Sequence, residues 1–130
     1  MARIFKNKWF ARFARKELIS DETLCQAVHR LQQGLMDANL GGGVIKQRLP
    51  RQGSGSSGGY RSIILFRYED RAFFVYGFAK SERDNIDEDE LTAFRKLADA
   101  MLPLDWSAID RLLKSKALVE VICNGSPEVL

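Results

Sequence analysis

Two long apolar segments joined by a short acidic turn constrain the fold of this chain more than any other feature. Residues 59–68 and 71–79 carry nearly continuous apolar side chains, and Glu69 and Asp70 separate them. Such a pair predicts an antiparallel hairpin, and continuous apolar character is typical of central strands that are covered on at least one face. The alternating segment 44–49 predicts a further strand. Segments 2–5 and 118–122 predict short strands, the second at an edge of the sheet.

Four segments have the periodicity of amphipathic helices. Segment 7–16 places Trp9, Phe10 and Phe13 on one apolar face, and this spacing favours core packing over the alternative of stacking nucleic-acid bases. The second helix is expected to begin after the N-cap Ser20. Its apolar residues recur at spacings of four, three and four, which predicts a buried stripe of Leu24, Val28, Leu31 and Leu35.

The last third of the chain adds two more helices. Asp87 and Glu90 have the spacing of a capping box, Pro103 ends the helix that they begin, and a short helix is expected at 105–115. The resulting order, β-α-α-β-β-β-α-α-β, predicts the α+β class, with the helices packed on one face of a small, mainly antiparallel sheet. Residues 1–123 are expected to form one domain, and residues 124–130 a flexible C-terminal tail.

The composition argues against several kinds of site. Cys25 and Cys123 form neither a disulfide framework nor a metal-binding motif, so each is expected to be a small apolar filler. His29, the only histidine, is expected to face solvent, and the acids at 87–90 suit a helix start better than a metal. We therefore expect chemistry without histidine, metal or cofactor. No apolar run is long enough to span a membrane and no signal segment is visible, which indicates a cytoplasmic protein.

Basic residues and glycines concentrate in the middle of the chain. Residues 38–68 contain no Asp or Glu, and seven of the ten glycines fall between residues 41 and 59. Residues 1–83 carry 15 basic and 7 acidic side chains, whereas residues 84–130 carry 5 and 10. Basic side chains attract a polyanion, and glycines let main-chain N–H groups approach phosphate oxygens. The pattern favours a polyanion-binding face, with a solvated basic hairpin as the alternative.

Three sequence motifs resemble the RelE/ParE superfamily of bacterial toxins. They are LGGGVIKQRL at residues 40–49, GSGSSGGYR at 53–61 and FFVYGFAKSERDNI at 73–86. The resemblance covers residues 1–122 and is strongest to the HigB-like RelE branch of type II toxin–antitoxin systems. It implies a compact sheet-and-helix fold and an endoribonuclease that cuts messenger RNA, in many relatives on the ribosome. It also implies a cognate antitoxin, usually a helix-turn-helix protein, as partner.

The family pattern also implies the residues of the site. It assigns catalysis to basic positions on the central strands and after them: Lys46, Arg48, Arg61, Lys80 and Arg83. RNA contacts are expected from Arg51, Ser56, Tyr60 and Arg67. Relatives of this branch commonly have lysine in the glycine–serine loop where this chain has Ser56. Because this chain lacks that lysine, an attenuated toxin is an alternative to a fully active one.

Cleavage of RNA by its own 2′-hydroxyl requires a base, stabilisation of the phosphorane charge and protonation of the leaving 5′-oxygen. Without histidine, a lysine crowded by cations is expected to act as the base, because like charges and desolvation favour its neutral form. Lys46 is the first choice and Lys80 the second. Arg48 and Arg61 are expected to clamp the phosphate, since a guanidinium donates paired hydrogen bonds. Arg83 is expected to position the RNA backbone.

Alternatives remain for single residues and for the whole chain. In the alternative interpretation, Lys46 and Arg48 are solvated strand residues. Arg61 then pairs with an acid such as Glu82. Tyr60 then packs in the core and does not stack on a base. For the whole chain, the alternatives are a gyrase-directed toxin and a catalytically inactive RNA- or antitoxin-binding member. The gyrase-directed relatives lack the catalytic cations, several of which this chain retains.

Overall fold

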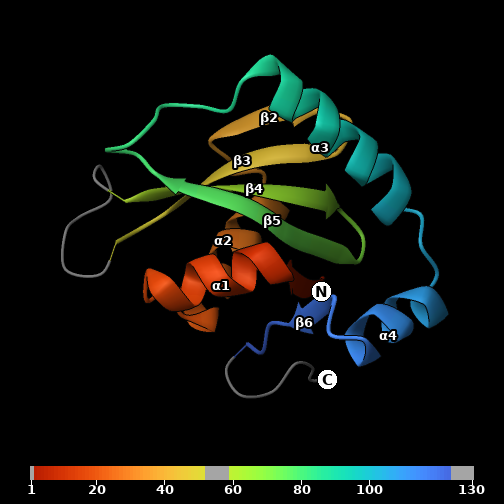
Figure 1. Cartoon of the computed structure of the whole chain (residues 1–130). Coiled ribbons are helices and arrows are strands. Elements are labelled where there is room, and N and C mark those ends of the chain that lie inside the picture. The colour runs from red at the N-terminus through yellow and green to blue at the C-terminus, as the bar shows by residue number, and fades with distance from the viewer. Residues whose placement is uncertain (1, 52–58, 124–130) are drawn as a thin grey trace.

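The computed structural model describes residues 2–51 and 59–123, and Figure 1 shows their arrangement. In chain order the elements are β1 (Arg3–Asn7), α1 (Lys8–Lys16), α2 (Asp21–Gln32), β2 (Ala38–Gly41), β3 (Val44–Leu49), β4 (Tyr60–Arg67), β5 (Arg71–Ala79), α3 (Glu88–Met101), α4 (Trp106–Lys114) and β6 (Leu118–Glu120).

One six-stranded sheet, in the order β2-β3-β4-β5-β1-β6, organises the chain. All neighbours pair antiparallel except β1 and β5, which are parallel. The β4–β5 hairpin lies in the middle of the sheet, as predicted, and the α+β class is confirmed. One strand was missed, because Asn39 and Gly41 give the short β2 a low β-propensity. It forms through pairing with β3.

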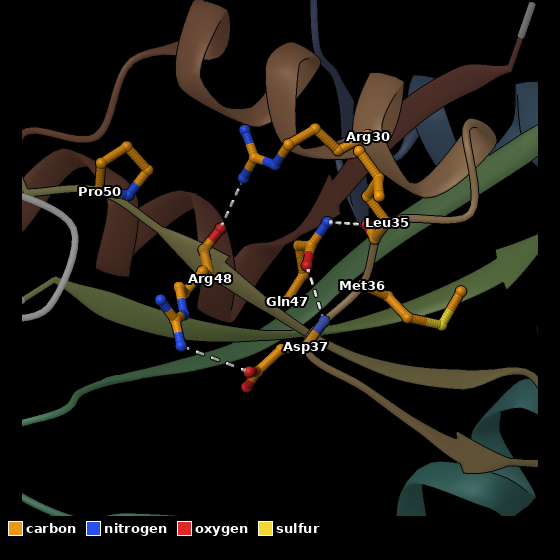
Figure 2. Close-up of a pocket in the computed structure, with 7 residues that line it drawn as sticks. All are labelled: Arg30, Leu35, Met36, Asp37, Gln47, Arg48 and Pro50. Atoms are coloured by element: carbon orange, nitrogen blue, oxygen red, sulfur yellow. Dashed lines mark hydrogen bonds and ion pairs between the residues drawn. The ribbon is translucent and has the colours of Figure 1, made fainter.

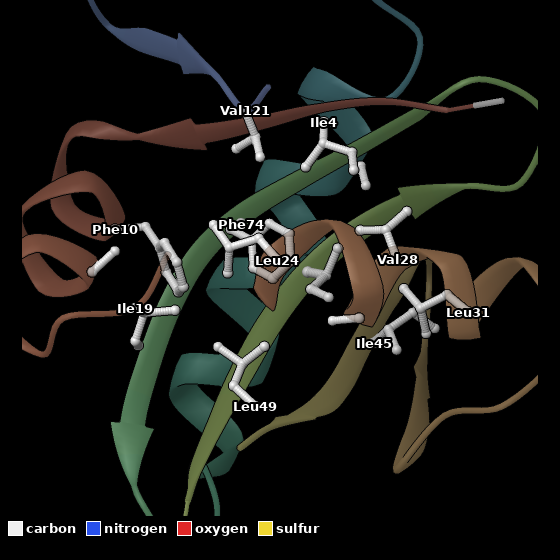
Figure 3. Close-up of a cluster of buried hydrophobic side chains, with 14 of the residues drawn as sticks. Ile4, Phe10, Ile19, Leu24, Val28, Leu31, Ile45, Leu49, Phe74 and Val121 are labelled. Carbon is white, nitrogen blue, oxygen red and sulfur yellow. The ribbon is translucent and has the colours of Figure 1, made fainter. Parts of the chain in front are cut away.

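The helices cover both faces of the sheet, which differs from the expectation of one face (Figure 1). Successive strand residues enter two separate cores. Ile4, Ile45, Ile64 and Phe74 pack with α1 and α2, and Figure 3 shows this cluster. Their neighbours Phe5, Val44, Leu65 and Phe73 pack with α3 and α4. Because the strands are apolar on both faces, each face requires its own helical cover, which explains their nearly continuous apolar sequence.

The predicted caps are confirmed at α2 and α3, and Asn7, expected inside the first helix, is the N-cap of α1. The Asn7 side chain accepts a hydrogen bond from the Phe10 N–H (2.8 Å), and the Ser20 hydroxyl accepts one from the Thr23 N–H (3.2 Å). Asp87 and Glu90 form the predicted capping box at α3. His29 is exposed, as expected.

The end of α2 differs from the prediction. The helix stops at Gln32, and Gly34 follows with a φ of 83°, a left-handed conformation that glycine adopts readily. The Leu35 N–H donates to the Arg30 carbonyl (2.8 Å) and the Gly34 N–H to the Leu31 carbonyl (2.9 Å), which is a Schellman motif. Leu35, expected in the buried stripe, is therefore 56% exposed.

Cys25 and Cys123 form a disulfide, so the expectation of two unpaired apolar fillers is wrong. The Ile122 N–H donates to a carboxylate oxygen of Asp21 (3.1 Å), which holds the segment after β6 against the start of α2. The two Cα atoms are 5.8 Å apart, within the range that a disulfide spans. The tail expected at 124–130 lies outside the described residues. Within the described parts of the chain, no helix combines the length and apolar character needed to cross a bilayer.

Candidate functional site

Three of the five residues expected to be catalytic lie together on one face of the sheet. Arg48 on β3 pairs directly with Arg61 on β4. Lys46 lies two residues before Arg48, so its side chain points to the same face. The β3–β4 pairing therefore brings together Lys46, Arg48 and Arg61 as predicted.

An acid that was not singled out in the sequence lies at the centre of these three cations. One Asp37 carboxylate oxygen, Oδ2, is 3.3 Å from Nε of Arg61 and 3.8 Å from Nζ of Lys46. The other oxygen, Oδ1, is 3.9 Å from Nη2 of Arg48. The alternative of an ion pair for Arg61 thus holds, with Asp37 as the acid in place of Glu82. Lys46 therefore has an acid beside it as well as the two arginines.

Two features of the chain place Asp37 there. The Schellman motif after α2 turns the backbone at Gly34 and leads it past β3. The buried Gln47 then fixes the turn: its amide donates to the carbonyls of Ala27 and Leu35 (both 3.1 Å), and its oxygen accepts from the Asp37 N–H (3.1 Å). Figure 2 shows Gln47 linking this segment to β3. Gln47 alternates with Lys46 and Arg48 along the strand, so it fixes the turn from the opposite face.

The electrostatics of the cluster require this acid. Arginines directly opposite each other across two strands repel. The Arg61 side chain is only 7% exposed, and a buried guanidinium without a counter-ion is costly. Asp37 offsets both effects. Because three cations face one carboxylate, the cluster keeps a net positive charge that suits an anionic ligand.

A hollow of about 400 Å³ opens beside Asp37 and Arg48, a volume within the range of small-molecule sites. Figure 2 shows its lining, which consists of Arg30, Leu35, Met36, Asp37, Gln47, Arg48 and Pro50. Nη2 of Arg30 donates to the Arg48 carbonyl (3.2 Å) and so ties α2 to β3 across the hollow. The exposed side chains of Leu35 and Met36 add an apolar wall.

Two further predicted residues lie at the same end of the sheet. The sheet register aligns Leu49, Tyr60 and Ala79 across three strands, and Lys80 directly follows Ala79. Lys80 is exposed, and its side chain makes no ion pair within residues 2–51 and 59–123. The Arg51 guanidinium lies 5.6 Å from the centre of the Tyr60 ring. Ser56 lies outside the described residues.

Tyr60 is oriented away from the cluster. Its ring is buried in the core beneath α1, on the opposite face of the sheet from Arg61, and its hydroxyl donates to a Glu17 carboxylate oxygen (2.9 Å). Burial, reinforced by Glu17, raises the pKa of Tyr60. This placement favours the packing alternative over base stacking.

Arg67 and Arg83 make their ion pairs away from the cluster around Asp37. Arg67, at the far end of β4, binds both oxygens of Asp70 (3.0 and 2.7 Å) and donates to the Leu102 carbonyl at the end of α3 (2.9 Å). Arg83 binds both oxygens of Glu90 (3.2 and 2.6 Å), and this pair raises the pKa of Arg83 and lowers that of Glu90. The structure therefore does not bring either arginine to Asp37.

The glycine run that precedes β3 does not face the cluster either. Residues Gly41, Gly42 and Gly43 all have positive φ and form the turn between β2 and β3, at the other end of β3 from Arg48. A Cβ on Gly43 would approach Leu102 Cδ1 of the α3 end to 2.5 Å. These glycines therefore serve a tight turn and close packing with α3.

Two residues of the site, Asp37 and Gln47, were not predicted from the sequence. A usable signal exists for Asp37, because it is the last acid before the acid-free segment and lies three residues after the helix-ending Gly34. No local pattern marks Gln47 as buried. No cluster of three or more metal-binding side chains occurs among residues 2–51 and 59–123.

Comparison with known proteins adds one match over nearly the whole chain. A family model described as the RelE toxin of the RelE/RelB toxin–antitoxin system matches residues 2–121. A comparison with curated proteins found no match.

Proposed function

Because the chain belongs to the RelE toxin family, we propose that it is an endoribonuclease that cuts messenger RNA, most effectively on the ribosome. The observation that supports this proposal is the convergence of Lys46, Arg48 and Arg61 on the Asp37 carboxylate, beside a hollow that Asp37 and Arg48 line. Family membership implies an antitoxin partner. We propose a helix-turn-helix antitoxin and a cytoplasmic site of action, where messenger RNA is translated.

The two arginines supply the phosphate clamp. Each guanidinium remains charged and donates paired hydrogen bonds that match phosphate oxygens. Arg48 is half-exposed and meets the incoming RNA, whereas the buried Arg61 lies behind it, held in a fixed orientation by Asp37. In other enzymes one such donor contributes about 2.7–4 kcal/mol to transition-state stabilisation. Lys46 lies within the same cluster and can transfer a proton, and the exposed Lys80 can bind a flanking phosphate.

Helix α1 adds positive charge next to this end of the sheet. Its exposed face carries four cations, Lys8, Arg12, Arg15 and Lys16, with no ion pair within the described part of the chain. Phe13 of α1 contacts the Tyr60 ring edge-on at 5.8 Å, which places the last turns of α1 beside the start of β4. Such a basic surface attracts RNA toward the cluster.

The test uses a reconstituted translation reaction with one defined messenger RNA and primer extension to detect cuts. Arg48→Ala is the informative variant, because Arg48 is half-exposed and its loss opens no core. The wild-type protein should cut the transcript, and Arg48→Ala should cut at least about tenfold more slowly. Arg111→Ala, an exposed arginine on α4, is the matched control and should cut at the wild-type rate.

Expression in cells gives a second readout. Production of the wild-type protein without its antitoxin should arrest growth, and Lys46→Ala should relieve the arrest. Intact transcripts in the presence of folded wild-type protein would contradict the nuclease. Inhibition of gyrase under those conditions would favour the gyrase-directed alternative. Toxicity that appears only with Ser56→Lys would favour the attenuated one.

A further inference from the structure

We infer that Asp37 is the general base of RNA cleavage and that Lys46 is the matching general acid. This assignment rests on the proposed nuclease function and changes the role first expected for Lys46. It follows from an arrangement in which one carboxylate oxygen, Oδ2, lies 3.8 Å from the Lys46 ammonium and 3.3 Å from the Arg61 guanidinium.

The ordinary charge states of the two groups suit these roles. At neutral pH an aspartate has no proton and can accept one, whereas a lysine ammonium has a proton to donate. The Asp37 carboxylate accepts no hydrogen bond from any side chain or N–H within residues 2–51 and 59–123. Its contacts with the three cations are ion pairs of 3.3–3.9 Å. An oxygen lone pair therefore remains available for the hydroxyl of a substrate.

The surroundings give a nucleotide access to this oxygen. The hollow of about 400 Å³ is lined by the charged side chains of Arg30, Asp37 and Arg48 and by the apolar Leu35, Met36 and Pro50. A ribose and base in the hollow would bring the 2′-hydroxyl to Asp37 and the adjoining phosphate to Arg48. Lys46 and Arg61 do not line the hollow, but both lie within 3.8 Å of Oδ2 of Asp37, the oxygen that would meet the 2′-hydroxyl.

The reaction then balances without another reactant. Asp37 takes the proton of the 2′-hydroxyl, and the 2′-oxygen forms a bond to phosphorus. The bond between phosphorus and the 5′-oxygen breaks, and Lys46 gives that oxygen a proton. The products are a 2′,3′-cyclic phosphate and a 5′-hydroxyl, and solvent returns the protons to their starting groups. Arg48 and Arg61 stabilise the charge of the phosphorane.

A purely structural role for Asp37 makes a different prediction. A counter-ion that only holds three cations together would, when removed, weaken RNA binding and lower stability. A general base would, when removed, slow cleavage by about 10²–10⁴-fold and leave binding intact or tighter, because a negative charge beside the phosphate is lost. The two roles therefore separate in one set of measurements.

The experiment compares the wild-type protein with Asp37→Asn and Asp37→Glu, and with Asp99→Asn as the control. Asp99 is an exposed acid on α3. Single-turnover cleavage of the transcript is measured in the translation reaction against pH, together with the melting temperature. Affinity is measured with a short RNA whose cut site carries one 2′-deoxyribose, which cannot be cleaved by this route.

We expect Asp37→Asn to bind this RNA at least as tightly as the wild type and to cleave about 10²–10⁴-fold more slowly. Asp37→Glu should recover part of the rate, and Asp99→Asn all of it. Cleavage by Asp37→Asn at the wild-type rate or faster would overturn the assignment alone, as would equal losses of binding and cleavage. A wild-type protein that cuts nothing would overturn the nuclease as well.

Discussion

Replacing Gln47 by methionine removes the side chain that positions Asp37 and nearly preserves its volume. Gln47 is 3% exposed, and its amide makes three hydrogen bonds of 3.1 Å, to Ala27, Leu35 and Asp37. Methionine fills the same space without donors or acceptors, so the change tests these bonds with little contribution from a cavity.

The expected loss of stability follows from these three bonds. Each contributes roughly 0.5–1.5 kcal/mol net. The Ala27 carbonyl is part of α2 and stays in place when Gln47 is replaced. Loss of the hydrogen bond to this carbonyl therefore costs the least of the three. The main chain of Leu35 and Asp37 lies at an exposed turn. Water there can partly replace the other two hydrogen bonds, to the Leu35 carbonyl and from the Asp37 N–H. We therefore expect a destabilisation of about 2–3 kcal/mol, which lowers the melting temperature by roughly 8–12 °C in a domain of this size.

The assay pairs urea unfolding with single-turnover RNA cleavage. Because the turn that carries Asp37 is no longer held, cleavage should fall at least about tenfold even below the melting transition. Gln33→Met makes the same change at an exposed position and should alter stability by no more than about 0.5 kcal/mol. If Gln47→Met matched Gln33→Met in both stability and cleavage, the reasoning about how Asp37 is positioned would be refuted.

Three further changes test other parts of the structure. Replacing both Cys25 and Cys123 by alanine should lower the free energy of unfolding by about 2–4 kcal/mol, because the disulfide closes a loop across a separation of 98 residues. Two arginines lower the pKa of Asp70 from 3.8 to about 2, so its contribution to stability is present above pH 4 and lost as pH falls toward 2. Asp70→Asn should therefore lower stability at pH 6 and much less at pH 2, as measured by urea unfolding. Tyr60→Phe should lower stability by about 0.5–1.5 kcal/mol through loss of the hydroxyl bond and leave RNA cleavage unchanged.

Each of these predictions has its own control. Adding dithiothreitol should destabilise the wild type but not the cysteine-free variant, and equal effects on both would argue against the disulfide. A constant difference between wild type and Asp70→Asn from pH 6 to pH 2 would contradict the assigned ion pairs. Slower cleavage by Tyr60→Phe at unchanged stability would support the expected RNA-binding role of Tyr60 and contradict a role in packing alone.

The features predicted correctly from the sequence are those encoded locally. The β4–β5 hairpin, the Ser20 cap and the Asp87–Glu90 capping box each depend on residues a few positions apart. Strand alternation also predicted Lys46 and Arg48 on one face, because a period of two fixes which side chains share a side, and Arg61, implied by the family resemblance, pairs with Arg48 there.

The features that were missed depend on contacts that the helix and strand periodicities do not report. The periodicity of α2 continues to Leu35, but the Schellman motif at Gly34 ends the helix first. The partner of Cys25 lies 98 residues away, and that of Arg83 is in the next helix. Asp37 meets its three cations only after β2, β3 and β4 have paired and Gln47 is buried. The local signal at Asp37, the last acid before the acid-free segment, does not identify these partners.

The most direct test of whether the cations around Asp37 bind a phosphate is to measure the affinity for an uncleavable RNA as a function of salt concentration. The probe is the single-stranded RNA with one 2′-deoxyribose at the cut site, and the comparison is Arg48→Ala with Arg111→Ala. Each phosphate contact adds about 0.7 to the slope of log affinity against log salt for a single strand. Arg48→Ala should weaken binding and reduce the slope by about 0.7, and Arg111→Ala should change neither. Equal affinities and slopes for the two variants would contradict a phosphate site at Arg48.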